Sequence, residues 1–382
     1  MPEFHRAPLV RLALSTVLAA MLCPGCEGPP RQPFPADRAA RFERALDEMH
    51  SDQFAVASLV AVDDGVHRYE GVRGLADRDE GRAMTRTTPF RTASLGKTFT
   101  AALVLSLHEE GALSVDDPVS DYLPDFPHGG AITLRMLLTH TSGVANYTHV
   151  SAWVDAASSG TPLTEREVVA LCAATELDFP PGTAWNYSNT GYLVLGMIAE
   201  QLVGRSVPEE LTARFFVPLG MSGTVPFAQA PPDLARGYER DGTAIEWDPA
   251  FVYPTDGGWV TTASDLMIWS RAFFGGALHS EATLALARQP EGGELLTSVA
   301  ESFGLDSGGY ALGFLAAEDD TLGTLYAGAG NAGGIRTFVG FLPERDLAFA
   351  TFVDVGDGTV PIVETLSATR PMLEALREDA QR

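Results

Sequence analysis

Residues 94–110 read SLGKTFTAALVLSLHEE, and this stretch decides how the rest of the chain is interpreted. From Phe99 to Leu107 it is apolar on nearly every side, which is typical of a helix buried in the middle of a protein. Ser94 and Lys97 stand three positions apart where this helix begins, so they share one helix face about one turn apart. The pattern predicts a buried central helix that carries a serine and a lysine at its start.

The choice of basic residues singles out Lys97. The chain has 26 lysines and arginines, and Lys97 is the only lysine among them. A guanidinium does not deprotonate in a protein, whereas burial and a helix N-terminus both favour the neutral amine of a lysine. A serine hydroxyl needs such a base nearby to become a nucleophile. The spacing alone is equally consistent with an N-cap serine followed by a lysine whose amine reaches solvent.

A second polar group is Tyr187-Ser188-Asn189, which follows PPG at 180–182 and precedes a helix predicted over 190–202. A phenol at such a junction can carry a proton, and Asn189 can orient a substrate amide or the lysine. Taken alone, a tyrosine in a loop is usually a packing residue whose hydroxyl is satisfied.

Together, Ser94-x-x-Lys97 and Tyr187-x-Asn189 resemble the motifs of the serine β-lactamase and penicillin-binding-protein superfamily, in its class C branch, which includes D-Ala-D-Ala carboxypeptidases and esterases. The resemblance covers about residues 40–375. It includes, in the same order and spacing, TAALVLSLHEEGALSVDDPVSDYLPDF, TLRMLLTHTSGV, PPGTAWNYSNTGYLVLGMIAEQLVG and GGWVTTASDLMIWSRAFF. It implies a site between a sheet domain and a helical domain, with Ser94 as the acylated nucleophile. Lys97 and Tyr187 would be the acid/base pair, and Asn189 would contact substrate and Lys97.

The sequence departs from this family at the third motif, where members carry Lys-x-Gly or His-x-Gly and the cation contacts a substrate carboxylate. The corresponding residues are Gly328-Ala329-Gly330, and the last histidine of the chain is His279. No shift of alignment therefore supplies a lysine or histidine side chain. Arg336, close in sequence on the next predicted strand, is a candidate replacement.

Gly328 and Gly330 are still expected at the substrate site. The backbone N–H of Asn331 and that of Ser94 are the expected donors of an oxyanion hole, because backbone donors do not depend on side-chain identity.

Three other signals are assigned no chemical role. Residues 328–333 match G-x-G-x-x-G, but strand-forming residues follow where a dinucleotide site needs a helix. The one C-x-x-C pair, Cys23 and Cys26, lies in the predicted signal segment and no H-x₃-H pair occurs, so we expect no metal site and no cofactor. His140, in LLTHTSG at 137–143, resembles a triad histidine, but the family resemblance implies a structural element there.

The order of predicted elements indicates the fold class. Strands are predicted near both ends of the chain, at 54–62, 66–72, 310–316, 321–327, 335–343 and 347–355. Helices are predicted at 37–50, 94–110, 133–139, 164–176, 188–203, 207–215, 262–274 and 361–378. We expect an α/β part plus an all-α part: an antiparallel sheet built from both chain ends and flanked by helices (37–111 and 251–382), with a mainly helical domain inserted at 112–250. The family resemblance implies the same β-lactamase/transpeptidase-like fold.

The N-terminus predicts export. Residues 1–26 combine His5, Arg6 and Arg11 with an apolar run at 12–22, which is too short to span ~30 Å of hydrocarbon. Cys26 resembles the lipid-attachment cysteine of a bacterial lipoprotein, and a secretory signal is the alternative. Residues 27–36 are Pro-rich and predict an extended tether. The protein is expected to be periplasmic, membrane-anchored as a lipoprotein, or secreted.

The net charge of -24 makes a nucleic-acid partner unlikely on electrostatic grounds. We therefore expect an exported serine hydrolase acting on a small-molecule acyl substrate: an ester or amide first, then a peptidoglycan-like peptide as a D,D-carboxypeptidase, then a β-lactam. A non-catalytic relative that serves as a binding or scaffold protein is the alternative of another class. Cys172, on an apolar helical stretch, is expected in the core.

Overall fold

The computed structural model describes residues 30–52, 55–239, 241–291, 300–301, 305–354 and 362–381. Residues 31–382 form one compact unit. The predicted signal segment and Cys26 lie outside the described residues. None of the helices in the described ranges is both long enough and apolar enough to cross a membrane.

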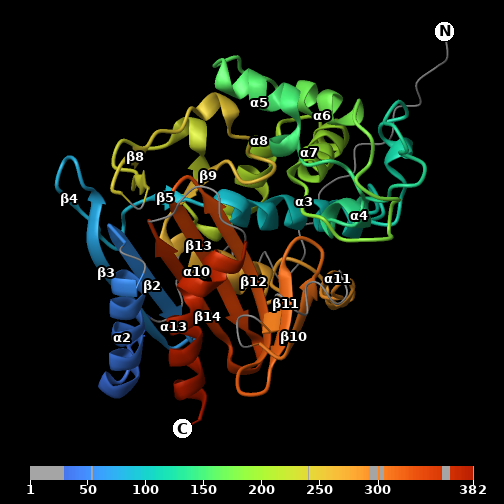
Figure 1. Ribbon diagram of the computed structural model, residues 1–382. Helices are drawn as coiled ribbons and strands as arrows, with labels where there is room; N and C mark the ends of the chain where they lie inside the picture. Colours follow the sequence, from blue (N-terminus) through green and yellow to red (C-terminus); the bar gives the residue numbers. More distant parts are fainter. Residues whose placement is uncertain are drawn as a thin grey trace. The chain divides into compact units, whose positions relative to one another are not determined.

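A nine-stranded sheet is the centre of the unit (Figure 1), with the order β1-β3-β2-β14-β13-β12-β11-β10 and β4 paired to β3. β2 and β14 pair antiparallel along six residues, so strands from the two ends of the chain meet in the middle of the sheet. The predicted fold class is confirmed, and β1 is the strand that runs parallel to its neighbour. The strands are β1 (Gln32–Pro33), β2 (Ala57–Asp63), β3 (His67–Asp77), β4 (Arg82–Ala83), β10 (Ser307–Tyr310), β11 (Leu315–Asp319), β12 (Gly323–Ala332), β13 (Ile335–Leu342) and β14 (Leu347–Val353).

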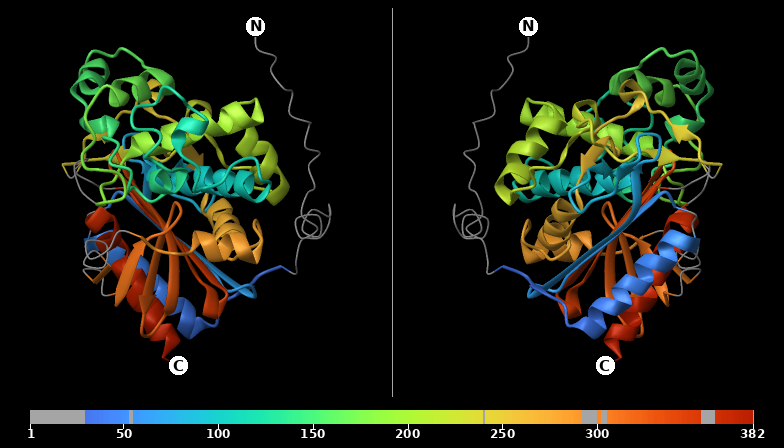
Figure 2. Two further views of the ribbon diagram at one scale, coloured as in Figure 1. Left: turned by 90° about the vertical axis from the view of Figure 1, so that its right-hand side faces the viewer. Right: turned by 90° about the vertical axis from the view of Figure 1, so that its left-hand side faces the viewer.

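Helices cover both faces of this sheet. α2 (Ala36–Asp52) and α13 (Ile362–Ala380) lie side by side on one face (Figure 2), and α10 (Ala263–Phe273) packs on the other. The side chains of β13 show why both faces of the sheet are covered. They alternate between the two faces, and apolar residues occur on each. Phe338 and Leu342 join the core beneath α2 and α13, whereas Val339 and Phe341 join the larger core that contains α10.

The inserted region packs against α3 (Lys97–Glu109). α3 is buried from Lys97 to Leu107 and packs against α7 and α8, as its all-round apolar pattern predicts. The other helices are α4 (Leu134–Leu138), α5 (Ser151–Ser158), α6 (Glu165–Ala173), α7 (Asn189–Val203), α8 (Val207–Leu211), a π-helical turn (Thr212–Phe216), α9 (Val217–Leu219) and α11 (Glu281–Ala287). Short 3₁₀ turns are η1 (Ala93–Gly96), η2 (Val119–Asp121), η3 (Tyr147–His149), η5 (Phe227–Gln229), η6 (Pro249–Phe251) and η7 (Pro343–Arg345).

The described residues also form two small sheets, the first of which joins the two parts. One has the order β5-β9-β6, from Phe90–Arg91, Trp259–Thr261 and Val225–Pro226. The other pairs β7 (Gly237–Tyr238) with β8 (Ala244–Ile245). The predicted helical region 112–250 therefore also contains short strands. Runs of two or three paired residues give too little periodicity to be read from sequence.

The expected tether at 27–36 is wrong from Gln32 onward. Gln32 and Pro33 pair with His67 and Arg68 at the edge of the sheet, a position that tolerates proline. Phe34 is 5% exposed and its ring packs edge-on against Phe42 at 5.2 Å. The apolar anchor, and not the proline content, decides the structure here.

Two element predictions need correction. The strand expected at 310–316 is broken in two, because Gly313 adopts a φ of 95° in the turn between β10 and β11. α5 was not predicted. Since none of its residues is buried, its sequence needs no strong apolar stripe, and such a stripe is the signal from which a helix is predicted. Cys172 is buried in the larger core, as predicted.

Candidate active site

Ser94 lies in the 3₁₀ turn η1, immediately before α3, with a partly exposed side chain. The turn holds an unusual backbone, since Ala93 has a φ of 47°. Two glycines make room for it. A Cβ on Gly330 of β12 would lie 2.1 Å from the Thr92 carbonyl oxygen, and one on Gly257 would lie 2.3 Å from that of Ala93. The serine is therefore clamped between β12 and the loop that precedes β9.

Lys97 is the first residue of α3 and is 1% exposed. Its Nζ donates to Asn189 Oδ1 at 2.6 Å and to the backbone carbonyl of Asp256 at 2.6 Å, and lies 3.4 Å from Ser94 Oγ. Burial lowers the pKa of Lys97 to about 8, while the Asp256 carboxylate acts in the opposite direction. Two of the three directions in which the nitrogen can make hydrogen bonds point to these acceptors, and the third points to Ser94.

Tyr187 and Asn189 reach the same place from the start of α7. Asn189 donates its backbone N–H to Asn146 Oδ1 at 3.3 Å. The Tyr187 ring centroid is 5.0 Å from Lys97 Nζ, and its hydroxyl is buried beside the Ser94 side chain. Burial raises the pKa of Tyr187, and the nearby Ser94 side chain offsets part of that rise. The four predicted residues Ser94, Lys97, Tyr187 and Asn189 thus come together.

Asp256 and Tyr147 belong to this group and were missed by the sequence reasoning. Tyr147 donates its hydroxyl to Asp256 Oδ2 at 2.7 Å. Asp256 stands in the sequence Asp256-Gly257-Gly258, just ahead of a stretch that carries the family resemblance. Nothing in the sequence relates residue 256 to residue 97, however, so only the fold reveals this neighbour.

His140 supports the tyrosine and does not face the serine. Its Nδ1 accepts the backbone N–H of Ser188 at 3.2 Å, and its ring centroid lies 4.4 Å from that of Tyr187. Burial and the nearby Lys97 hold the pKa of His140 well below the usual value, so the ring is neutral. Its φ of 62° and its burial fit the structural role that was expected.

The third-motif residues lie on β12, next to η1. Gly328 faces Leu95 and Thr98, and Gly330 faces Thr92. β11 pairs only as far as Ala327, so residues 328–332 lie beyond its reach. The G-x-G-x-x-G match spans this strand and a hairpin turn into β13, so it lacks the helix that a dinucleotide site requires.

Arg336 is not a replacement for the missing cation. Thr337 donates its hydroxyl to the Thr92 carbonyl at 2.8 Å, which places Thr337 on the Ser94 face of β13. Arg336 alternates with it and shares the opposite face with Phe338, beneath α2 and α13. The sheet therefore separates Arg336 from Ser94.

Within the described ranges, no group of three or more His, Cys, Asp or Glu residues could hold a metal ion. Two surface hollows of about 480 and 560 Å³ are lined by residues around β1 and β3, such as Asp64 and Arg68, and by none of the Ser94 group. The side chains of Ser94, Lys97 and Tyr187 bring a hydroxyl, an amine and a phenol together at the site.

Comparisons with known proteins show which family and which fold the chain resembles. Residues 39–363 match the family model described as Beta-lactamase. Penicillin-binding protein 4 of Amycolatopsis lactamdurans is 34% identical over 278 residues, covering 67% of this chain and 70% of that protein. Esterase EstB of Burkholderia gladioli is 30% identical over 271 residues, covering 61% of this chain and 69% of EstB. The structure of D-amino acid amidase from Ochrobactrum anthropi SV3, complexed with D-phenylalanine, has the same fold, with a TM-score of 0.75 at 23% identity over 90% of this chain and 100% of that one.

Proposed function

The chain belongs to the beta-lactamase family, and from that premise we propose that it is an exported serine hydrolase that forms an acyl-enzyme on Ser94. The observation that carries this proposal is the environment of Lys97. The only lysine of the chain is buried, and two carbonyl oxygens at 2.6 Å hold its nitrogen beside the serine. The export rests on residues 1–26 and on their likeness to a signal segment.

The proposed role of Lys97 follows from counting hydrogens on its nitrogen. A neutral amine has two hydrogens and one lone pair. If the hydrogens go to Asn189 and to the Asp256 carbonyl, the lone pair remains for the hydroxyl hydrogen of Ser94, 3.4 Å away between heavy atoms. Lys97 then takes this proton as Ser94 Oγ bonds to the acyl carbon.

Tyr187 is proposed as the acid of the pair. Its high pKa keeps the phenol protonated, and its buried hydroxyl lies close to the Ser94 side chain. It can therefore donate to the leaving oxygen or nitrogen, and Lys97 can return a proton to it. In the second half of the reaction, water attacks the acyl carbon and the same groups work in reverse.

An oxyanion hole from Ser94 and Asn331 is supported by the register of β12. Ala332 and Ile335 close the hairpin to β13 around a two-residue turn. Hydrogen-bonded and non-bonded pairs alternate from such a closing pair, so Gly330 bonds to β13 and Asn331 directs its N–H away from it. That edge is the one that β11 leaves open. The side chain of Asn331 takes no part in this proposal.

The proposed substrates are uncharged esters or amides with a small acyl group, ahead of D,D-peptides and β-lactams. A carboxylate at the site would need a cation, and Gly328 offers only backbone while Arg336 lies behind the sheet. A charge-assisted hydrogen bond is worth about 1.5–3 kcal/mol, or roughly 10- to 150-fold in binding. Its absence disfavours substrates that end in a carboxylate.

The first test is labelling with a serine-directed fluorophosphonate, read by intact mass. Wild type should gain one adduct and Ser94→Ala none. A wild type that neither labels nor hydrolyses a panel of esters, amides and β-lactams would instead favour the non-catalytic binding role. Adduct formation on Ser94→Ala would assign the nucleophile elsewhere.

The second test restores the third-motif cation. A Cβ at Gly328 would lie 3.0 Å from Thr98 Cγ2, so Gly328→Lys is combined with Thr98→Ser, which removes that methyl group and keeps the hydroxyl. Relative to Thr98→Ser alone, the double variant should raise kcat/KM for a carboxylate-bearing ester about 10- to 150-fold. A wild type that already prefers this ester over its neutral analogue would contradict the proposed substrate class.

A further inference from the structure

Asp256 contacts the candidate base through its backbone carbonyl, and its carboxylate acts on the same lysine through its charge. Its carbonyl oxygen accepts the hydrogen bond from Lys97 Nζ at 2.6 Å, which ties residue 256 to the site. Its carboxylate, in a residue that is 8% exposed, accepts the Tyr147 hydroxyl at 2.7 Å and interacts electrostatically with Lys97. Burial disfavours the ionised carboxylate and raises the pKa of Asp256, whereas the charge of Lys97 and the hydrogen bond from Tyr147 favour the ionised form.

Among the residues that the structure describes, Lys97 is the only cation that acts on the Asp256 carboxylate, and Asp256 is the only anion that acts on Lys97. The titratable groups that face them come from η3, α6, the loop before β9, the loop before α7, the turn after α4 and α7 itself: Tyr147, Glu165, Tyr253, Tyr187, His140 and Tyr192. The tyrosines have raised pKa values and His140 a lowered one, so these neighbours are neutral near pH 7.

We propose that the Asp256 carboxylate, held by Tyr147, is the counter-charge of Lys97 and sets the pH at which Lys97 gives up its proton. The inference rests on the proposed role of Lys97 as the base. Asp256 touches no reacting atom in it and is a positioning residue that acts through Lys97.

The physical reason is the balance between two opposing effects on Lys97. Burial alone disfavours the ammonium form and would leave a neutral but weakly basic amine. A base works best when its pKa lies near the working pH, and Asp256 moves the pKa of Lys97 back up to about 8. Tyr147 helps by hydrogen bonding to the ionised carboxylate, which favours that form over the neutral acid that burial favours.

The same charge acts during the proposed reaction. As Ser94 Oγ bonds to the acyl carbon, its proton moves to Lys97 Nζ and creates an ammonium ion in a buried site. The Asp256 carboxylate stabilises that ion until the proton leaves for the departing oxygen or nitrogen. Glu165 opposes this effect only when ionised, and burial raises its pKa to about 8.

The sole lysine allows a direct test that needs no turnover. Protein grown with ¹³Cε-lysine, and carrying a lysine-free tag, should show one side-chain Cε signal, from Lys97. Its chemical shift against pH gives the Lys97 titration in the full chain. We expect the midpoint to fall by about one pH unit in Asp256→Asn, because an opposite charge has been removed. Tyr147→Phe should shift it in the same direction by less.

The matched control is Asp265→Asn. Asp265 is also a buried acid whose pKa burial raises, but it lies in α10 with Thr224 and the Gly223 N–H as partners. It should leave the Lys97 signal unmoved. A midpoint that stays in place or rises in both Asp256→Asn and Tyr147→Phe would overturn the inference. If Asp256→Asn does not fold, as judged by circular dichroism, Tyr147→Phe decides alone.

The pH profile separates this inference from the proposed function. If the hydrolase is active, the acid limb of kcat/KM should move to lower pH in Asp256→Asn by the same amount as the signal. If the signal moves but no variant, including wild type, has hydrolase activity, the effect of Asp256 on Lys97 is kept. Only the proposed hydrolase function is then contradicted. An unmoved signal in an active enzyme would contradict only the pairing.

Discussion

Lys97 is the residue on which most of the chemistry depends, and its neighbours explain why an arginine could not replace it. Its nitrogen fits between two carbonyl oxygens at 2.6 Å with 1% of the residue exposed. A guanidinium is planar, larger and permanently charged. The chain uses arginine for its other 25 basic positions, which is consistent with a need for a group that can lose its proton here.

Lys97→Arg should therefore lose nearly all turnover, by at least 100-fold, which is the low end of general-base contributions. The charge is kept and the titratable proton is not. The measurement is kcat/KM on a neutral ester, with thermal melting as the folding control. Substantial hydrolysis by the folded variant would remove Lys97 from the mechanism.

At this scale the sequence could predict the residues that come in motifs, and no others. Ser94 and Lys97 lie on one turn, and Tyr187 and Asn189 are two positions apart. Each pair can therefore be recognised from its spacing in the sequence. Asp256 stands 159 positions from Lys97, and its contact with the lysine is made by a backbone carbonyl that any residue would supply. Such a neighbour leaves no pattern in the sequence.

His140 provides a contrasting prediction. It holds the Ser188 N–H and packs on Tyr187, but burial keeps its ring neutral. His140→Asn keeps an acceptor and tolerates the positive φ of 62°. It should destabilise the fold by about 1 kcal/mol through the lost ring contacts. The acid limb of the kcat/KM profile should stay at the same pH, because a neutral His140 contributes no charge near Lys97. A loss of activity as large as that of Lys97→Arg would make His140 a catalytic residue after all.

Among the elements, η1 depends most on its neighbours. Its backbone packs against β12 so closely that residue 330 must be a glycine. Any side chain there would collide with the Thr92 carbonyl oxygen. The sequence predicted that β12 would edge the site through a resemblance, whereas the break between β10 and β11 went unseen because Gly313 looks like any strand glycine. Short pairings and turns are set by tertiary contacts that the local pattern does not contain.

Gly330→Ala tests the clamp directly. The added Cβ would meet the Thr92 oxygen at 2.1 Å and must push β12 away from η1. Kcat should fall more than ten-fold, since a displacement of about 1 Å near the nucleophile has effects of that order. Gly130→Ala is the matched control, because its nearest neighbour is Ser120 Oγ at 3.8 Å. Equal effects of both substitutions would show that the contact at Gly330 does not matter.

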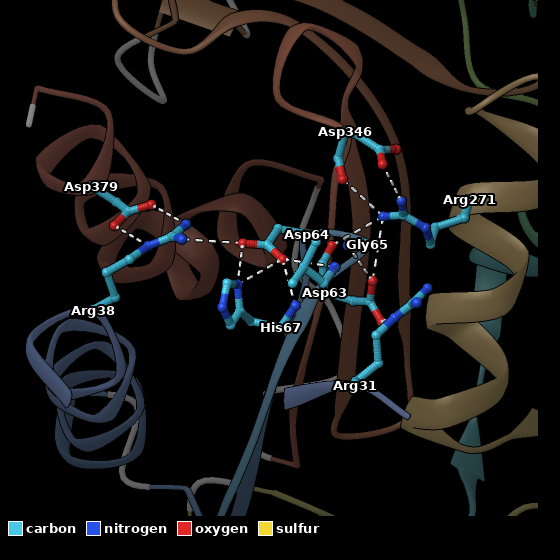
Figure 3. Close-up of polar contacts among 10 residues, drawn as sticks. Arg31, Arg38, Asp63, Asp64, Gly65, His67, Arg271, Asp346 and Asp379 are labelled. Carbon is cyan, nitrogen blue, oxygen red and sulfur yellow. Dashed lines mark hydrogen bonds and ion pairs between the residues drawn. The ribbon is translucent and has the colours of Figure 1, made fainter. Parts of the chain in front are cut away.

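For the whole molecule, the meeting of the two chain ends is the main organising feature. β2 pairs with β14, and α2 lies beside α13. A network of charges joins these elements near the β2–β3 turn (Figure 3): Arg38 bonds to Asp379 and to Asp64, and Asp64 accepts from His67. Arg41 also bonds to Asp379, and both side chains are only 5% exposed.

Asp379 should therefore matter for stability and its neighbour Glu378 should not. Asp379→Ala removes the buried partner of Arg41 and one of the two partners of Arg38, at a cost of about 3 kcal/mol. Glu378 pairs with Arg44 at 56% exposure on both sides, so Glu378→Ala should cost less than about 1 kcal/mol. Urea unfolding at pH 7 compares them. Similar midpoints for the two variants would show that the network does not hold the ends together.

The overall charge of -24 gives a second, long-range reason for the proposed preference for neutral substrates. The net charge repels anions at long range, whereas glycine at 328 fails to provide a local contact. Added salt weakens the first effect and so distinguishes it from the second. The Debye length falls from about 30 Å at 0.01 M salt to 3 Å at 1 M, so added salt removes the long-range part only.

We expect kcat/KM for a carboxylate-bearing ester to rise several-fold between 0.01 and 0.5 M salt, while that for its neutral analogue stays nearly constant. The anionic ester should still be the poorer substrate at 0.5 M, because no side chain at Gly328 meets its carboxylate. Parallel steady-state assays on the two esters measure both effects. If salt closes the gap completely, the field of the whole protein selects the substrate and the third motif does not. If the gap does not respond to salt, the missing contact is sufficient by itself.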